Sequence, residues 1–83
     1  MTGYFVYIVE CADHTFYVGS TTDLGKRLHA HNHLKSGAHY TKIRRPVTLY
    51  YSEKVDSFAL ARAREAEWKK LTREEKIRLI AIT

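Results

Sequence analysis

One carboxylate interrupts the apolar face of a helix expected in the second half of the chain. Ala61, Glu65 and Trp68 fall on the same face at helical spacing. A charged group in that position is costly unless it is paired or coordinates a metal ion. Glu65 is therefore a candidate metal ligand, but an edge position or an ion pair with a neighbour such as Arg62 also explains it. The periodicity alone favours the ordinary explanation.

Two polar side chains share the apolar stripe of an earlier helix. The stripe, at i, i+3, i+4 and i+7, consists of Leu24, Arg27, Leu28 and His31. A joint role of Arg27 and His31 in a functional site is one interpretation. In the other interpretation, the aliphatic part of Arg27 packs on the stripe while its charge reaches solvent, and His31 is solvated. The spacing alone favours this second interpretation.

Two tyrosines lie in neighbouring β-rich segments. Tyr7 and Tyr17 are ten residues apart, and the apex of the hairpin between them is expected near residues 12–13. A register that pairs Tyr7 directly with Tyr17 would place both rings on one face of the sheet. A slip of one residue would place them on opposite faces, and the sequence does not decide between these registers. Packing is the commonest role of tyrosines in strands.

A run of histidines and a lone cysteine raise two further possibilities. On a helix, only His29 and His33 share a face, while His31 points elsewhere. No HExxH pattern or cysteine pair accompanies them, so a solvent-facing cluster is a better account than a zinc site. Cys11 stands alone, which excludes an intrachain disulfide and indicates a cytoplasmic chain.

The segments that must position these side chains follow the order β-β-α-β-α-α. Strands are expected over residues 3–10, 15–19 and 47–51, and helices begin near Leu24 and after Asp56 or Ser57. Residues 32–45 show no clear period, so we expect a helix end and a loop there. Thr72 and Glu75 have the spacing of a capping box, which predicts a last short helix.

Composition limits the class of protein. The 83 residues allow one domain, over residues 1–83, of the α/β layered class. The longest apolar run, Tyr4 to Val9, is far shorter than the roughly 20 residues that cross a bilayer, and we expect no membrane association. A net charge of +5 with six tyrosines and five histidines is typical of a nucleic-acid-binding surface. Ordinary solubility charge explains the excess equally well.

Taken together, these residues resemble the GIY-YIG nuclease superfamily. Phe5-Val6-Tyr7 stands at its first signature, Tyr17-Val18-Gly19 at its second, and Arg64-Glu65 in a helix similar to the one that carries the family's metal carboxylate. Further similar segments are Ser20–Leu24, Lys26–Asn32, Tyr40-Thr41 and Arg44–Val47. The resemblance runs from about Tyr4 to Ile80 and is strongest to the small, single-domain bacterial branch.

Two positions depart from the family pattern. Phe5 replaces the glycine of the first signature, a change that the small branch commonly tolerates. No asparagine follows Asn32, whereas some members use a late asparagine near the site. That role is unfilled here or belongs to another residue.

The resemblance implies a role for each candidate residue. Tyr7 or Tyr17 would be the general base, and the other would orient the water or the phosphate. A phenol with a pKa near 10 needs positive charge nearby to lower that pKa, which Arg27 and the metal could supply. Arg27 would hold the scissile phosphate. Glu65 would bind one Mg²⁺ or Mn²⁺ ion, and His31 would hydrogen-bond the tyrosine or the phosphate.

A basic segment follows these residues. Its cations, Lys35, Lys42, Arg44 and Arg45, could hold phosphates that flank the cleavage site, or they could belong to a solvated loop. No further recognition element is apparent in the sequence. Weak sequence preference, recognition of DNA shape or dependence on a partner would follow from this.

The sequence therefore predicts a metal-dependent DNA endonuclease of the α+β class. Its fold would be a three-stranded antiparallel sheet flanked by helices, and its cofactor one Mg²⁺ or Mn²⁺ ion. DNA would be its partner, with a protein partner or a homodimer left open, and DNA repair or recombination its setting. The alternatives are a nucleic-acid-binding module that cuts little by itself and acts with a partner, or a structural domain with incidental basic charge.

Overall fold

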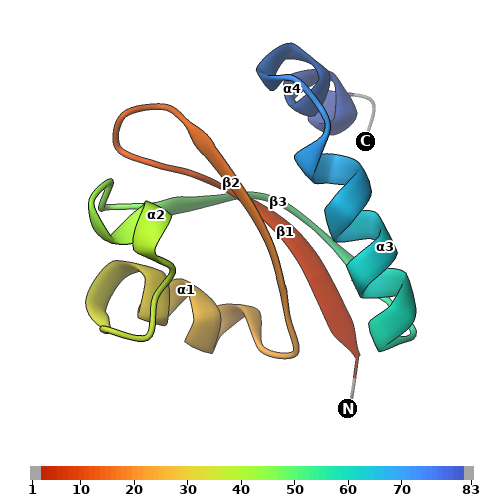
Figure 1. The fold of residues 1–83 in the computed structure, drawn as a ribbon, viewed down its shortest axis with the longest axis horizontal. Coiled ribbons are helices and arrows are strands. Elements are labelled where there is room, and N and C mark those ends of the chain that lie inside the picture. The colour runs from red at the N-terminus through yellow and green to blue at the C-terminus, as the bar shows by residue number, and fades with distance from the viewer. Residues whose placement is uncertain (1–2, 82–83) are drawn as a thin grey trace.

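The computed structural model describes residues 3–81 and contains three strands and four helices in that range (Figure 1). In chain order they are β1 (Tyr4–Glu10), β2 (Phe16–Thr21), α1 (Leu24–His33), α2 (His39–Lys42), β3 (Thr48–Val55), α3 (Phe58–Lys69) and α4 (Arg73–Ala81). No helix in this range is long and apolar enough to cross a membrane. The predicted α+β class is confirmed.

The three strands form one antiparallel sheet in the order β2-β1-β3. Tyr7 pairs with Gly19, and Val9 pairs with Tyr17. The direct pairing of Tyr7 with Tyr17 considered above is therefore wrong by two residues, because the hairpin turn is longer than expected. Since side chains alternate with a period of two, a shift of two residues still leaves both tyrosines on one face.

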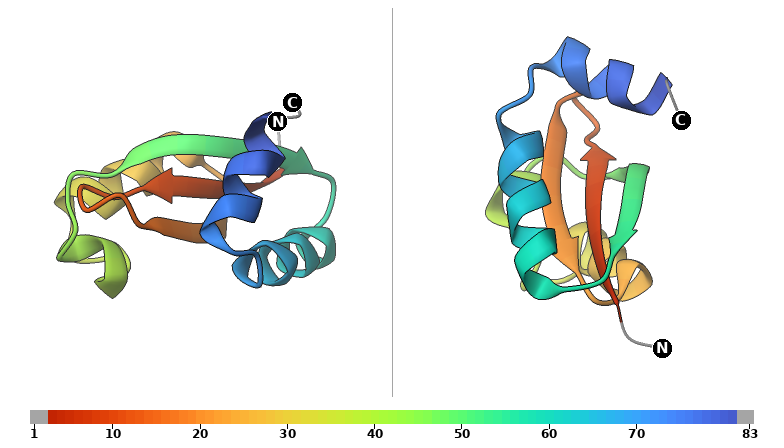
Figure 2. Two further views of the ribbon diagram at one scale, coloured as in Figure 1. Left: turned by 90° about the horizontal axis from the view of Figure 1, so that it is seen from above. Right: turned by 90° about the vertical axis from the view of Figure 1, so that its right-hand side faces the viewer.

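Each face of the sheet has its own small core. Val6, Ile8 and Val18 point to the α3 side and pack with Ala61 and Trp68. On the opposite face, a second cluster of Tyr7, Val9, Cys11 and Val47 packs against side chains that include Leu24 and Leu28 of α1. The central strand β1 is thus buried on both sides, as its continuous apolar sequence predicts. Figure 2 shows the helices on either side of the sheet.

The helix ends follow the capping chemistry of the sequence. The Asp23 side chain accepts a hydrogen bond from Lys26 N at the start of α1, and Ser57 caps α3 through Leu60 N. At α4, Thr72 Oγ1 accepts from Glu75 N, while Thr72 N donates to Glu75 Oε1. These reciprocal bonds are the predicted capping box.

Two segments differ from the prediction. β3 extends to Val55, beyond the expected end at residue 51, because its second half pairs with β1. The segment expected to be loop contains α2, a single turn that is too short to show a periodic pattern. Gly37 precedes it, and a Cβ there would lie 2.4 Å from the Ala30 carbonyl oxygen. This close approach lets the loop return against the end of α1.

Candidate active site

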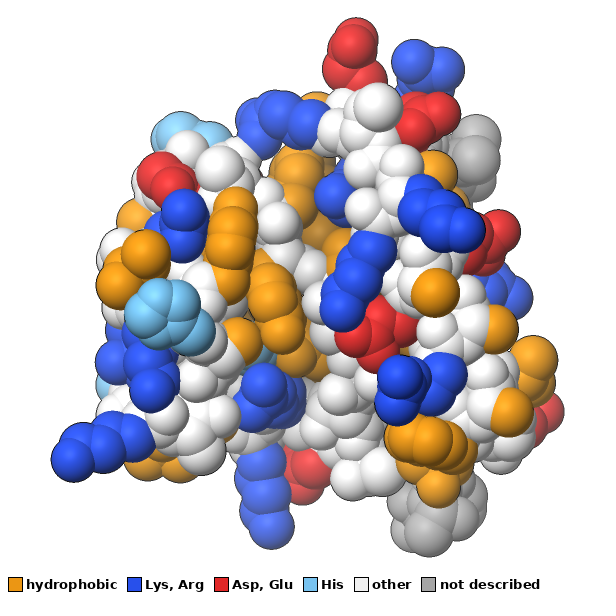
Figure 3. Space-filling model, in the orientation of Figure 1, with side chains coloured by type: hydrophobic (Ala, Val, Ile, Leu, Met, Phe, Trp, Pro, Cys, Tyr) orange, Lys and Arg blue, Asp and Glu red, His pale blue; other side chains and the backbone are white. Residues whose placement is uncertain are grey.

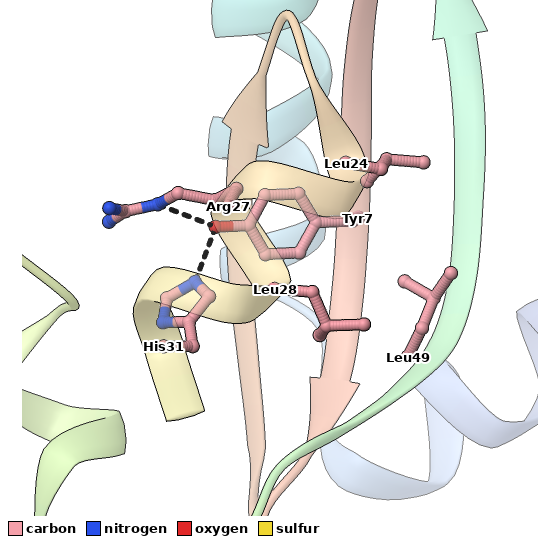
Figure 4. Close-up of a pocket in the computed structure, with 6 residues that line it drawn as sticks. All are labelled: Tyr7, Leu24, Arg27, Leu28, His31 and Leu49. Atoms are coloured by element: carbon pink, nitrogen blue, oxygen red, sulfur yellow. Dashed lines mark hydrogen bonds between the residues drawn. The ribbon is translucent and has the colours of Figure 1, made fainter. Parts of the chain in front are cut away.

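The Tyr7 hydroxyl is the centre of a buried polar cluster (Figure 4). It lies 2.7 Å from His31 Nε2 and accepts a longer hydrogen bond, 3.4 Å, from Arg27 Nε. The ring is only 2% exposed and is surrounded by Leu24, Leu28 and other apolar side chains of a small pocket. β1 supplies the tyrosine, and α1 supplies both polar partners from one helical stripe.

Gly19 explains how the tyrosine fits. A Cβ at this position would lie 2.4 Å from the Tyr7 hydroxyl oxygen, so a larger residue would force the ring away. The two residues pair across β1 and β2, and the absent side chain leaves space for the phenol. The glycine of the Tyr17-Val18-Gly19 segment therefore positions the Tyr7 hydroxyl through this close approach.

His31 is fully buried, which overturns the interpretation of this residue as a solvated histidine. Its Nε2 faces Tyr7 and its Nδ1 lies 2.8 Å from Thr41 Oγ1. Burial, reinforced by the positive charges of Arg27 and Arg45, lowers the pKa of His31 from 6.5 to about 4. The imidazole is therefore neutral at neutral pH.

The pKa of Tyr7 does not follow the expectation that nearby positive charge lowers it. Burial raises the pKa, and this outweighs the opposite effect of the hydrogen bond and charge of Arg27. The negative charge of Glu65 raises it further. A phenolate at Tyr7 therefore needs a proton acceptor in direct contact.

Tyr17 borders the same cluster through ring contacts. Its ring meets His31 edge-on at a centroid distance of 5.3 Å and stacks on Tyr40 of α2 at 5.9 Å. The Arg44 guanidinium covers the Tyr40 ring at 3.9 Å. Within residues 3–81 the Tyr17 hydroxyl has no hydrogen-bond partner, so it is free to contact a substrate.

Glu65 is held by two partners on the α3 side of the sheet. Ser20 Oγ donates to Glu65 Oε1 at 2.8 Å, and Lys69 Nζ lies 2.9 Å from Oε2. Burial raises the pKa of Glu65, but the Lys69 and Ser20 hydrogen bonds with the charges of Lys69 and Arg62 hold it below its usual range. An ion pair at Glu65 was one expectation, but its partner is Lys69 and not the suggested Arg62.

The edge strand β2 connects the two parts of the site. Gly19 lies beneath the Tyr7 hydroxyl, and the next residue, Ser20, points to the opposite side and binds Glu65. Figure 3 shows the molecule in the orientation of Figure 1, with a hollow lined by hydrophobic atoms and with acidic atoms flanked by Lys and Arg side chains. β2 therefore lies between Tyr7, Arg27 and His31 on one face of the sheet and Glu65 on the other.

The oxygen donors around Glu65 fit a hard divalent cation. Mg²⁺ binds through one or two carboxylates and keeps several of its waters. Glu65 and the Ser20 hydroxyl offer such donors at a partly exposed position. Residues 3–81 contain no cluster of three or more His, Cys, Asp or Glu side chains, so any ion here would depend on few protein ligands.

The four predicted phosphate-binding cations differ in their surroundings. Lys35 is exposed and Lys42 is half-buried. Arg44 Nε pairs with Asp13 Oδ2 at 3.1 Å, while its Nη1 donates to the Tyr40 carbonyl. Arg45 donates to the carbonyls that end α1, including His31 O at 2.6 Å. The two lysines are thus free for phosphates, whereas the arginine side chains also hold the fold together.

Four contacts at the site were not predicted. Ser20 and Lys69 bind Glu65, Thr41 binds His31, and Tyr40 stacks on Tyr17. The position of Lys69, four residues after Glu65, was a readable signal for a helical ion pair. The residues of α2 offered no periodic signal, because a single turn of helix is too short to show one; only the resemblance of Tyr40-Thr41 to a segment of the family singled them out.

A sequence model of the GIY-YIG catalytic domain matches residues 3–78. The chain belongs to the GIY-YIG family. GIY-YIG domains are the catalytic domains of a nuclease family, so DNA is the implied substrate, and these nucleases are generally metal-dependent.

Small bacterial GIY-YIG proteins resemble the whole chain. A UPF0213 protein of Syntrophus aciditrophicus is 51% identical over 80 residues, which are 96% of this chain and 92% of that protein. A UPF0213 protein of Staphylococcus aureus is 46% identical over 96% of both chains. These relatives confirm the similarity to the small single-domain bacterial branch of the family.

Two structures solved by NMR share the fold. The UPF0213 protein BH0048 from Bacillus halodurans is 37% identical, with a TM-score of 0.62 over 100% of this chain and 86% of that one. The protein EF2693 from E. faecalis is 34% identical, with a TM-score of 0.67 over 96% of this chain and 84% of that one.

Proposed function

We propose that this GIY-YIG protein is a metal-dependent DNA endonuclease that hydrolyses phosphodiester bonds, with residues 1–83 acting as one catalytic domain. The observation that carries the proposal is the placement of the Tyr7 hydroxyl between Arg27 and His31, with Glu65 bonded to Ser20, the residue next to Gly19 on β2. Hydrolysis needs a base for water, a cation for the phosphate and a site for a metal, and these residue types supply all three.

Arg27 is the group best placed to hold the scissile phosphate. Its Nε donates to Tyr7 and its Nη1 to the Ser36 carbonyl, which fixes the guanidinium while other N–H groups remain available. A phosphate bound there would lie next to the tyrosine hydroxyl. A guanidinium in this position stabilises the charge that develops on the phosphoryl oxygens.

Glu65 would hold one Mg²⁺ or Mn²⁺ ion, with Ser20 orienting the carboxylate. A bound divalent ion supplies charge stabilisation and promotes ionisation of a coordinated water. The Lys69 ammonium now balances the carboxylate and would have to move away from Oε2.

Tyr7 is the better candidate for the general base. Its hydroxyl contacts a neutral histidine, which can accept the phenolic proton, whereas Tyr17 contacts His31 only through its ring. Tyr17, whose hydroxyl has no partner within residues 3–81, would orient the water or the phosphate. This division gives each tyrosine one task.

The substrate would be recognised through DNA shape more than through base sequence. The described residues form only the sheet and its four helices, with no additional DNA-binding domain that would read bases. A role on nicked or branched DNA in repair or recombination, in the cytoplasm and with a protein partner or a second copy, agrees with this.

A second candidate function is DNA binding with little intrinsic cleavage. Both Glu65 oxygens already have partners, Ser20 and Lys69, and this favours a carboxylate with a structural role. Under this alternative the chain would act with a partner that supplies the cutting activity.

Cleavage of labelled duplex, branched and single-stranded DNAs with Mg²⁺ or Mn²⁺ tests the proposal. We expect wild type to cut and Glu65→Ala to lose cleavage by at least about 100-fold while still binding DNA. Glu67→Ala is the matched control, because Glu67 is an exposed carboxylate on the same helix.

The outcomes separate the two candidate functions. Normal cleavage by Glu65→Ala would remove Glu65 from the site. If wild type bound DNA without cutting any substrate in either metal, the binding module would replace the endonuclease.

A further inference from the structure

A chain of hydrogen bonds runs from the candidate base into the interior of the protein. The Tyr7 hydroxyl lies 2.7 Å from His31 Nε2, and His31 Nδ1 lies 2.8 Å from Thr41 Oγ1. Thr41 Oγ1 in turn lies 2.9 Å from the Ala38 carbonyl oxygen. His31 and Thr41 are both fully buried, so solvent has no access to either of them.

Counting protons fixes the direction of these bonds. The Ala38 carbonyl can only accept, so the single hydroxyl proton of Thr41 points towards it. Thr41 Oγ1 then accepts from His31, which places the imidazole proton on Nδ1. A neutral histidine carries one ring proton, so its Nε2 is left as an acceptor for the Tyr7 hydroxyl.

The opposite arrangement leaves a buried proton without a partner. If His31 carried its proton on Nε2, the Tyr7 oxygen would accept from both His31 and Arg27. Arg27 has no acceptor atom, and no other described residue bonds to this hydroxyl, so the phenolic proton would be unpaired. An unpaired buried donor is costly, and this favours the first arrangement.

We propose that Thr41 is a positioning residue that holds His31 in the Nδ1–H tautomer, so that His31 Nε2 accepts the proton of the Tyr7 hydroxyl. The catalytic consequence rests on the proposed endonuclease function. As the attacking water gives a proton to the Tyr7 oxygen, the phenolic proton moves to His31 Nε2. The hydroxide oxygen bonds to phosphorus, and the 3′ oxygen leaves with the electron pair of its P–O bond and takes a proton from solvent.

Substrate binding would strengthen this acceptor. The groups around His31 are two tyrosines, Tyr7 and Tyr17, and two arginines, Arg27 and Arg45. The positive charges of the two arginines oppose a proton on the imidazole ring. A phosphate bound to Arg27 would offset one of these charges. His31 would then be most basic when the substrate is bound, so it would remain unprotonated in the free protein.

The tautomer can be read directly by NMR of ¹⁵N-labelled histidine in the full chain without DNA. We expect His31, assigned by the loss of its signals in His31→Gln, to show a protonated Nδ1 and an unprotonated Nε2. Thr41→Val keeps the shape but removes the hydroxyl, and it should change the ring pattern and slow cleavage by at least about tenfold at unchanged KM. Thr41→Ser should restore both.

The result that overturns the proposal is a protonated Nε2 in wild type, or an unchanged ring pattern in Thr41→Val. Amide spectra and thermal unfolding show whether Thr41→Val remains folded. If it does not, the test is the His31 tautomer in wild type and in Thr41→Ser. A wild type that cuts no DNA contradicts the endonuclease function, whereas the tautomer still decides the role of Thr41.

Discussion

At the scale of single residues, the two tyrosines occupy different environments although they share a face of the sheet. The Tyr7 hydroxyl is buried and bonded to His31 and Arg27, whereas the Tyr17 hydroxyl has no partner within residues 3–81. Removing the first hydroxyl therefore affects folding and chemistry together. Removing the second breaks no described hydrogen bond.

We expect Tyr17→Phe to lose cleavage without losing stability. Its melting temperature should match wild type, because no described hydrogen bond is broken, while Tyr7→Phe should lose about 1 kcal/mol of unfolding free energy. Thermal unfolding and cleavage assays on both variants check this. Near-normal cleavage by both would exclude a tyrosine base.

The buried histidine predicts how stability depends on pH. The pKa of His31 is about 4 in the fold against 6.5 when it is free, so the unfolded chain binds more protons in between. The free energy of unfolding should therefore fall by up to about 3 kcal/mol as the pH drops from 6.5 to 4. Denaturant unfolding across this range measures it.

Two histidine variants isolate this contribution. His31→Gln should lose the part of the pH dependence that comes from this histidine, although its stability at neutral pH is already lower. His29→Gln should keep it, because His29 is exposed on the same helix. If the free energy of unfolding had the same pH slope in wild type and His31→Gln, His31 would not be the source of the pH dependence.

At the scale of elements, β2 and α2 bring the site together. Gly19 and Ser20 of β2 face opposite sides and meet Tyr7 and Glu65 respectively. α2 closes the cluster from the other end, where Thr41 reaches His31. Both segments are short, so they depend on the packing of neighbouring elements for their positions.

We expect Gly19→Ala to disrupt the site through its Cβ. The added carbon would lie 2.4 Å from the Tyr7 hydroxyl oxygen, so the ring must shift and its bonds to His31 and Arg27 must break. Stability should fall by about 1–3 kcal/mol, and cleavage should fall with it.

Gly25→Ala provides the control for this substitution. Its Cβ would lie 3.6 Å from the Asp23 side chain, an ordinary contact in α1. It should leave cleavage intact and raise stability by up to about 1 kcal/mol. Unfolding and cleavage assays on Gly19→Ala and Gly25→Ala test this prediction. Equal effects of the two variants would contradict a steric conflict between the Cβ at position 19 and Tyr7.

At the scale of the whole molecule, the net charge is +5, and the four cations predicted to bind phosphate fall into two kinds. Lys35 is exposed and Lys42 is half-buried, whereas the Arg44 and Arg45 guanidiniums are bonded to the protein. Charges of the first kind can neutralise phosphates at little structural cost. Those of the second kind stabilise the chain where α1 ends and β3 approaches.

We expect the two kinds of cation to separate in a salt titration of DNA binding. The double variant Lys35→Ala with Lys42→Ala should reduce the slope of log K against log salt by roughly 2 at unchanged melting temperature. Arg45→Ala should lower the melting temperature, because the carbonyls at the end of α1 lose their donors. An unchanged salt slope in the lysine double variant would exclude both lysines from the DNA interface.

The local chemistry of the chain was largely predictable from its sequence. The strands of β-branched and aromatic residues, the Ser57 cap and the Thr72–Glu75 capping box depend on contacts between near neighbours. The spacing of Glu65, Arg27 and His31 marked them as unusual but favoured ordinary packing roles, and the resemblance to the GIY-YIG family made them candidates for catalysis.

Tertiary structure alone decided how those residues meet. The strand register, the burial of His31 and its bond to Thr41 depend on contacts between residues distant in sequence, which no local pattern encodes. Burial is also what raises the pKa of Tyr7 and lowers that of His31, since desolvation disfavours their charged forms. The residue types indicated a site, and the three-dimensional packing determined which proton each group can hold.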